Sequence, residues 1–467
     1  MKRENTYKIK AANWKMKVLA KAKVYLPLLC IFLMTSCEDE FLDIKPDKAL
    51  LVPESIEDHQ ELLNNISMLN VDPILNFIIS DNYVVFDRYY NFMATPTERN
   101  GYIWAEDVYE GQAVAEWTNL YRQIFYANVV LEGLENTDYS PQTEDRWNMA
   151  LGSALFFRAY GHFNLLRIFA PLYDPGDSEQ LGIPLKLNSS ISNTPPRSSL
   201  VECYESIFED LAMASELLPE QSSSINQPSK MTVDGLLARI HLLRREYDMA
   251  GEYAQRVLQR KSNLVDFNDL NVHASMPFNN HFAESFFYSL GVSYSLLNLA
   301  SLSTELWESY DDNDLRKYAF FLNRGGGFVT LKATYSGNRN FYSGMATDEF
   351  YLIYAESLAR ANDVQGAMNL INTLLEKRYA TGTFTPISAA NADEALDIVL
   401  QERRKELVYR GWRGDDLRRL NKESRYAKTL MRDLNGESYT LPPNDPRYVW
   451  PIPDIEVRQA GLVQNER

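Results

Sequence analysis

The chain has 467 residues, of which 45% are hydrophobic and 12% aromatic. This composition is typical of a globular protein with a sizeable core and argues against long disordered regions. Its net charge of −16 becomes −23 without the first 36 residues, which hold eight Lys/Arg and one Glu. Such an acidic chain repels phosphate backbones, so the composition argues against a nucleic-acid partner.

The first 36 residues are typical of a secretory signal peptide of the lipoprotein type. Four lysines between residues 15 and 23 precede an apolar run at 24–34, and Thr35-Ser36 lead into Cys37. The run is shorter than the roughly 20 residues of a membrane-spanning helix. We therefore predict cleavage before Cys37 and lipid attachment to its new N-terminus. The alternative is a short transmembrane anchor with an incidental cysteine.

Helical periodicity dominates the first half of the remaining chain. Apolar residues at three- and four-residue spacing predict helices over 115–134 and 145–169, and Pro171 follows the second of them. A third helix is expected over 200–218, with Ser198 or Ser199 as its N-cap and Pro219 after its end.

Two stretches repeat one another further along the chain. Ala238 and Ala250 are twelve residues apart, and so are Ala355 and Ala367; in both copies apolar residues follow four and seven positions after the second alanine. Small residues at this spacing let two antiparallel helices approach closely, as in tetratricopeptide repeats. The sequence therefore predicts an all-α fold with an α-solenoid core of tetratricopeptide-like helix pairs.

Two aromatic-rich segments interrupt this helical pattern. Residues 76–110 and 278–342 hold 24 Phe, Tyr or Trp in 100 positions, twice the chain average, and the second lies in a loop insertion predicted over 265–345. A solenoid core does not need such insertions, and long loops of distinctive composition commonly carry function. We expect these two segments to form a ligand-binding site.

The chemistry of the two segments favours sugar binding. The faces of sugar rings stack on Trp and Tyr, while their hydroxyl groups need polar side chains. Trp104 and Tyr83 are the foremost candidates, although any single aromatic residue can instead pack the loops onto the core. The full set of candidate ligand residues is Asp81, Asn82, Tyr83, Arg88, Tyr102, Trp104, Tyr294 and Trp307.

Other chemical interpretations are weaker. Glu402 and Glu406 could be the paired carboxylates of a glycosidase, but neighbouring arginines favour ion pairs, which keep a carboxylate ionised and unsuited to act as an acid. No histidine pair has metal-ligand spacing, no phosphate-binding loop or nucleophile elbow is present, and Cys203 is expected to be a buried thiol. We predict no metal and no cofactor.

Several motifs in order resemble the SusD/RagB family of surface nutrient-binding lipoproteins. The resemblance covers nearly all of the chain after Cys37, although no single motif decides it and Tyr409-Arg410 precede Gly411 where the family usually has an acidic residue. The motifs are Phe41-Leu42-Asp43, Ala154–Tyr160, Pro196–Ser199, Tyr351–Leu358, Glu402–Leu407, Gly411-Trp412-Arg413 and Trp450–Pro453.

The resemblance implies a role and a place in the cell. It implies a non-enzymatic lipoprotein of the outer membrane, anchored through Cys37 and exposed at the cell surface, that captures oligosaccharides for a SusC-like TonB-dependent transporter. Peptide binding by the same fold is an alternative, and a surface glycosidase a further one. The expected parts are the signal peptide 1–36, an N-terminal part 37–220 with ligand segment 76–110, and a C-terminal part 221–467, together one compact unit.

Overall fold

Long helices form where the sequence has three- and four-residue apolar spacing. The computed structural model describes residues 53–192 and 194–467; the predicted signal peptide and Cys37 lie outside these residues. Helices α7 (Ala115–Glu135), α8 (Glu144–Phe169) and α9 (Leu200–Leu217) confirm the three helices expected in this part of the chain. Residues 54–467 form one compact unit.

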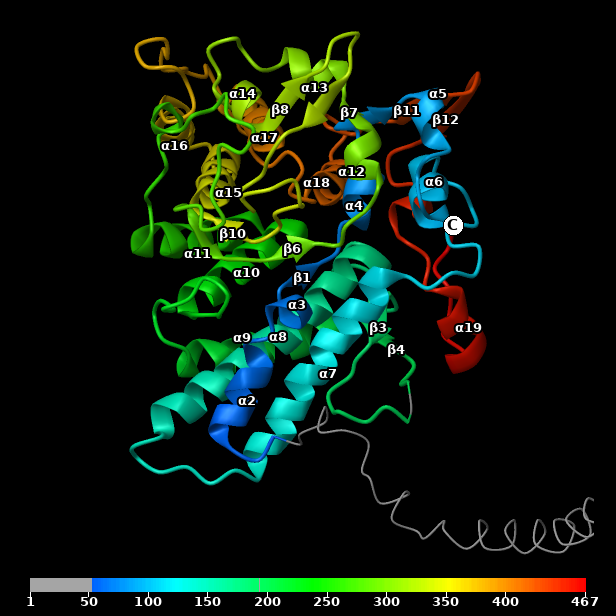
Figure 1. The fold of residues 1–467 in the computed structure, drawn as a ribbon, viewed down its shortest axis with the longest axis vertical. Coiled ribbons are helices and arrows are strands. Elements are labelled where there is room, and N and C mark those ends of the chain that lie inside the picture. Colours follow the sequence, from blue (N-terminus) through cyan, green and yellow to red (C-terminus); the bar gives the residue numbers. More distant parts are fainter. Residues whose placement is uncertain (1–52, 193) are drawn as a thin grey trace, which may run out of the picture. The chain divides into compact units, whose positions relative to one another are not determined.

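The start of α9 shows how the sequence sets a helix boundary. The Ser199 side chain accepts a hydrogen bond from the Glu202 backbone N–H at 3.1 Å, and the Glu202 carboxylate accepts one from the Ser199 N–H at 2.8 Å. This reciprocal capping box satisfies two donors that a helix leaves free. Helices α7, α8 and α9 pack in succession, and α2 (Ile56–Leu63) lies across α7 and α8 (Figure 1).

The two predicted helix pairs are present and share their turn geometry. They are α10 (Lys230–Leu243) with α11 (Tyr247–Arg260), and α15 (Thr347–Arg360) with α16 (Val364–Glu376). The left-handed residues of the two turns, Arg245 (φ 64°) and Asn362 (φ 66°), each follow the first alanine of their repeat by seven positions. The four alanines that define the repeats are at most 1% exposed, as close helix packing requires.

The pairs stack into a continuous helical layer. Helix α9 packs on α10, α11 on α15, and α15 also on α17 (Ala392–Glu406), which is followed by α18 (Arg413–Leu420). At the α11–α15 contact a Cβ on Gly251 would lie 2.4 Å from the Ser357 Cβ. The two helices can therefore approach this closely because residue 251 has no side chain. The all-α, tetratricopeptide-like prediction is confirmed.

The two aromatic-rich segments contain short helices and short strands joined by loops. Strand β2 (Tyr83–Val85) of the first segment pairs antiparallel with β7 (Ala300–Leu302) of the second. The further helices here are α3 (Ile66–Leu69), α4 (Leu75–Ile78), α5 (Asp87–Tyr90), α6 (Pro96–Tyr102), η2 (Phe267–Asp269), α12 (Leu296–Leu299), α13 (Thr304–Glu308) and α14 (Arg316–Phe320).

Short strands and the C-terminal segment complete the fold. The pairs are β1 (Val71–Asp72) with β6 (Leu290–Gly291), β3 (Leu181–Pro184) with β4 (Arg197–Ser199), β10 (Met345–Ala346) with β5 (Ser285–Phe287), β8 (Phe321–Asn323) with β9 (Val329–Leu331), and β11 (Leu430–Leu434) with β12 (Glu437–Leu441). Then come η3 (Pro446–Tyr448) and α19 (Asp454–Ala460). Within residues 53–192 and 194–467 no helix is long and apolar enough to cross a membrane.

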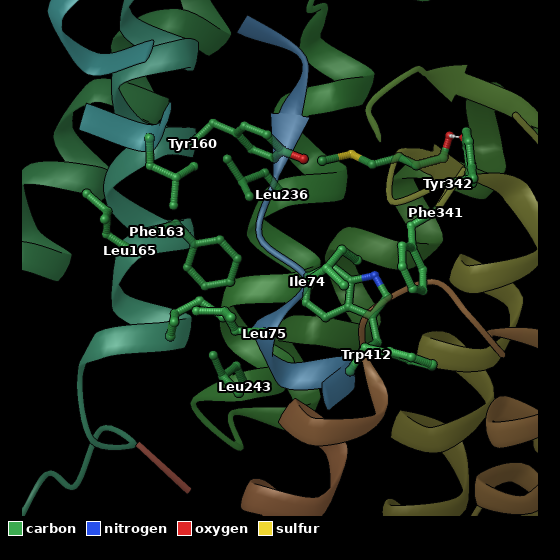
Figure 2. Close-up of a cluster of buried hydrophobic side chains, with 14 of the residues drawn as sticks. Ile74, Leu75, Tyr160, Phe163, Leu165, Leu236, Leu243, Phe341, Tyr342 and Trp412 are labelled. Atoms are coloured by element: carbon green, nitrogen blue, oxygen red, sulfur yellow. Dashed lines mark hydrogen bonds between the residues drawn. The ribbon is translucent and has the colours of Figure 1, made fainter. Parts of the chain in front are cut away.

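One hydrophobic core joins the helical layer to the aromatic segments. Ile74 and Leu75, on the segment that runs from β1 into α4, lie between Phe163 of α8 and the side chains of Phe341 and Trp412 (Figure 2). All five residues are at most 5% exposed. Many aromatic residues of the two segments therefore belong to the hydrophobic core. Their packing determines which side chains of the segments remain at the surface.

Candidate functional site

A hollow lies where the two aromatic segments meet the β11–β12 hairpin. It has a volume of about 950 Å3, within the range of ligand sites. Figure 1 shows α5, β7 and the β11–β12 hairpin close together around this region. Five of the eight candidate ligand residues line the hollow: Asp81, Tyr83, Arg88, Tyr102 and Trp104.

The floor of the hollow consists of aromatic rings that pack against the guanidinium group of an arginine. Trp104 and Tyr102 are 1% exposed and Tyr83 is 2% exposed. The Arg432 guanidinium lies 4.1 Å from the Tyr102 ring centroid and 4.5 Å from that of Trp104, and it donates to the carbonyl oxygen of Ser80 at 2.6 Å. Such cation–π contacts occupy the ring faces that a sugar would need.

This arrangement leaves little of the Trp104 and Tyr83 rings open for stacking, although both are the foremost candidates for ligand contact. Arg432 comes from β11, more than 300 residues away, so nothing in the local sequence of either aromatic residue signals it. Trp104 also adopts a left-handed backbone conformation (φ 53°), which turns the chain at the end of α6. A ligand contact with these rings remains a prediction.

A more accessible aromatic group begins at Phe86, which lines the hollow, and continues through two rings that pack beside it. Phe86, Tyr89 and Phe328 are half-buried, with ring centroids 5.7 Å apart for Phe86–Phe328 and 5.2 Å for Tyr89–Phe328. The exposed Arg88 guanidinium lies 4.8 Å from the Tyr89 centroid. We call Phe86, Tyr89 and Phe328 the rim triad. Sequence reasoning missed Phe86 and Phe328, because Phe328 arrives on the β8–β9 turn from a distant part of the chain.

A polar wall beside the floor is organised around Asp81. Its carboxylate accepts hydrogen bonds from Arg413 at 2.7 Å and Lys428 at 3.0 Å, and Arg404 lies 3.4 Å away. Burial works against ionisation of Asp81, but these three cations hold its pKa well below the usual range. Asn82 joins the same wall, since its Oδ1 accepts a hydrogen bond from Arg404 at 3.0 Å.

The wall suits binding rather than proton transfer. An ionised carboxylate with a depressed pKa accepts hydrogen bonds but does not donate a proton at neutral pH. Lys428 reaches Glu305 at 3.3 Å as well as Asp81, so donors and acceptors alternate along this side of the hollow. Such fixed polar groups beside aromatic side chains can orient a polyhydroxylated ligand.

Two candidate residues lie elsewhere. The Tyr294 hydroxyl donates to the two carboxylate oxygens of the buried Glu116 at 2.7 and 2.9 Å. The Trp307 ring packs edge-on against Phe321 and has the Lys317 ammonium 4.9 Å from its centroid. Neither lines the hollow, so the structure does not bring Tyr294 and Trp307 together with the other six.

The two glutamates considered as a glycosidase pair are ion-paired inside the protein. Glu406 is 1% exposed and accepts from Arg316 and Arg378, each at 2.8 Å; Glu402 accepts from Arg316 at 2.7 Å and Lys405 at 3.0 Å. Burial opposes ionisation of Glu406, yet the two arginines lower its pKa to about 2. A group in this state is no general acid, and the pair does not line the hollow.

The remaining reactive side chains are structural. Cys203 is fully buried, its thiol donates to the Ile183 carbonyl at 3.7 Å, and burial raises its pKa to about 11, far from that of a reactive thiolate. In the part of the chain that the structure describes, no group of three His, Cys, Asp or Glu side chains is arranged to hold a metal ion.

Comparison with known proteins decides the family. A family described as "Starch-binding associating with outer membrane" matches residues 40–242, and the SusD family matches residues 347–467. The chain belongs to the SusD/RagB family. A relative, SusD-like protein P2 of Formosa agariphila, is 25% identical over 443 residues, which cover 79% of this chain and 82% of the relative.

Solved structures share the fold. A SusD superfamily protein from Bacteroides vulgatus has a TM-score of 0.71 at 20% identity and covers 88% of this chain and 99% of its own. A SusD-like carbohydrate binding protein from the same species has a TM-score of 0.66 at 19% identity and covers 86% and 96%. The expected SusD-like fold is thereby confirmed.

Proposed function

We propose that the protein binds oligosaccharides in the hollow lined by Asp81 and Arg88, without chemical conversion of the ligand. The observation that carries this proposal is the placement of the rim triad beside the polar wall. Aromatic faces take the apolar faces of sugar rings, while the wall supplies fixed hydrogen-bond partners for hydroxyl groups. The match to a family described as starch-binding, and a structural neighbour named as carbohydrate binding, support it.

The proposed role includes a place and a partner. Lipid on Cys37 would hold the acidic protein at the outer membrane, and a SusC-like TonB-dependent transporter would receive the ligand. A single acyl chain holds a protein only marginally, so several chains or the transporter must contribute to stable residence. Cys37→Ala should therefore abolish membrane retention, measured by cell fractionation, and leave ligand binding by the purified protein unchanged.

The binding test compares matched phenylalanine substitutions. A glycan array with the purified protein identifies a ligand, and calorimetric titration then measures Phe86→Ala and Phe328→Ala. We expect each to weaken binding about tenfold, or about 1.4 kcal/mol, because a stacking face is lost. Phe384→Ala is the control, since Phe384 is also half-buried but packs on Tyr379, outside the hollow.

Three results would contradict the proposal. Equal losses with Phe86→Ala and Phe384→Ala would remove the rim triad from the site. A peptide panel that binds where oligosaccharides do not would favour the peptide-binding alternative. Release of sugar from a glycan by the purified protein, abolished by Glu402→Gln, would restore the glycosidase interpretation.

A further inference from the structure

A second hollow, with a volume of about 520 Å3, lies at the carboxyl end of α8 and shares no lining residue with the first. Its walls come from the loop after α8 (residues 171–177), the end of α18, the η3 region and the last residues of the chain. These segments are far apart in sequence, and the core holds them in place. The hollow is therefore a preformed cavity rather than a gap in one loop.

Four cationic side chains line this hollow without a carboxylate partner. They are Arg197, Arg245, Arg418 and Lys422, and among the described residues none has a carboxylate oxygen within 4 Å. Most other buried arginines that the structure describes are paired, as Arg239 is with Glu349 at 2.7 Å. Arg432 also lacks a carboxylate partner, but aromatic rings enclose its guanidinium group. Of the four, Arg197 and Arg418 are buried, whereas Arg245 is half-buried and Lys422 is exposed. A buried charge without a partner is costly, so the two buried arginines need an explanation.

The three arginines are positioned by backbone carbonyls. Arg418, which is 4% exposed, donates to the Ala170 carbonyl at 2.6 Å; Arg197, 9% exposed, donates to the Gly182 carbonyl at 2.8 Å; Arg245 donates to the Tyr173 carbonyl at 3.1 Å. These bonds cap α8 and fasten the neighbouring loops. They fix the guanidinium groups in space but supply no full negative charge to balance them.

The acidic groups around the hollow do not neutralise these cations. Asp445 is paired with Arg447 at 2.8 Å, and Asp174 and Asp177 are exposed at the rim, where each accepts a backbone N–H of its own turn. Glu466 is exposed as well, and Asp415, which acts on Arg418 electrostatically, is paired with Arg167 at 2.7 Å. The deep part of the hollow is cationic and its acidic groups stay at the edge.

One buried amide adds a free donor. The Asn421 side-chain nitrogen, which lies beside the Tyr448 hydroxyl, is buried and makes no well-formed hydrogen bond within the described residues. Buried donors are nearly always satisfied, by protein, water or ligand. A donor whose only nearby acceptor is the weakly placed Tyr448 hydroxyl, next to guanidinium groups without carboxylate partners, can serve an acceptor that enters from outside the chain.

We propose that this second hollow binds a small polyhydroxylated acid through its oxyanion, the carboxylate of a sugar acid or the sulfate of a sulfated sugar. Arg245 and Lys422 contact the oxyanion from the more accessible side, above the floor formed by Arg197 and Arg418. Asn421, Asn444 and Gln180 serve the hydroxyl groups. Guanidinium groups suit this task because they present several N–H donors to an oxyanion at once. The proposal does not depend on the first hollow.

Calorimetric titration of the purified protein with four probes tests the proposal. Galacturonate, galactose 6-sulfate or both should bind saturably and more weakly as salt rises, whereas galactose should not. Arg245→Ala and Lys422→Ala should each weaken this binding about tenfold, as expected for loss of one charge-assisted contact. Arg458→Ala, at an exposed arginine of α19 outside the hollow, should leave it unchanged.

The same titrations can overturn the proposal. Absence of binding by both acidic sugars, equal binding of galactose, or unchanged affinity in both Arg245→Ala and Lys422→Ala would each refute it. Inorganic sulfate, the fourth probe, should bind more weakly than the sulfated sugar; equal affinity would show an adventitious ion only. Thermal unfolding of each variant verifies that the two substitutions, both at side chains with solvent contact, leave the fold intact.

Discussion

The helix pairs and the aromatic segments of this protein use opposite means to build one core. In α10–α11 and α15–α16 the partners are about twelve residues apart, and small side chains allow the contact. In the aromatic segments the partners are far apart: β2 pairs with β7, and Arg432 fills a cage made by Tyr83, Tyr102 and Trp104. The spacing of small residues within a helix pair can be recognised in the sequence, whereas contacts between distant segments cannot.

The largest expected effect comes from a residue that joins the two regions. Arg316 of α14 is fully buried and donates to Asp314, Glu402 and Glu406, the last two on α17. Arg316→Met should leave three buried carboxylates with only Arg378 and Lys405 as cationic partners and lower the free energy of unfolding by about 3–5 kcal/mol, measured by urea unfolding. Arg425→Met is the control, because its pairs with Asp393 and Asp397 are exposed; a similar loss there would contradict the role of burial.

The second prediction distinguishes aromatic residues that stabilise the core from aromatic residues that contact the ligand. Trp104→Ala should lower the free energy of unfolding by about 3 kcal/mol, because it empties part of the Arg432 cage. Phe86→Ala, at the rim, should reduce binding with a much smaller loss of stability. Urea unfolding of both variants checks this, and a stable Trp104→Ala protein with weakened glycan binding would return Trp104 to the ligand surface.

A third effect is a pH dependence at a contact between the regions. Glu116 of α7 is fully buried with Tyr294 as hydrogen-bond donor, and burial raises its pKa to about 7. Between the unfolded pKa near 4.5 and pH 7 the unfolded chain loses this proton and the folded protein keeps it, so stability falls as pH rises. The loss should reach up to about 3 kcal/mol.

Glu116→Gln gives the matched measurement. The amide keeps the shape of the protonated carboxyl group but does not titrate, so the variant should lose this part of the pH dependence. Urea unfolding at pH 5 and pH 8 compares the two proteins. An identical change in both would show that Glu116 is already ionised at pH 5.

The smallest effect tests close approach inside the helical layer. Gly251→Ala should lower the free energy of unfolding by about 1–2 kcal/mol, because the new Cβ meets Ser357 of α15. Ser357→Gly removes the opposing atoms, so the double variant should recover part of the loss. A double-mutant cycle by thermal or urea unfolding measures the coupling, and strictly additive effects would argue against a direct clash.

The sequence predicted the helices well, whereas its choice of ligand residues stays a prediction. Ser199 with Glu202 and the alanine spacings define helix ends and helix pairs within a few turns of chain, so they were predictable. Asp81 and Arg88, predicted as ligand residues, both line one hollow. Trp104 and Tyr83 line it too but are almost fully buried, and contact of these residues with a ligand stays a prediction. Tyr294 and Trp307 were grouped with them by composition alone, which carries no information on position.

The amino-acid sequence by itself determined the helical periodicity and the repeat, because both depend on residues close together in the chain. It also determined the acidic charge and the order of family motifs, because these depend only on residue identity and position in the chain. Only the tertiary structure decided which aromatic side chains stay accessible. Arg432, Phe328 and the cations of the second hollow reach their places through contacts across hundreds of residues. Ring faces are covered or left open by such distant partners, and no local pattern encodes them.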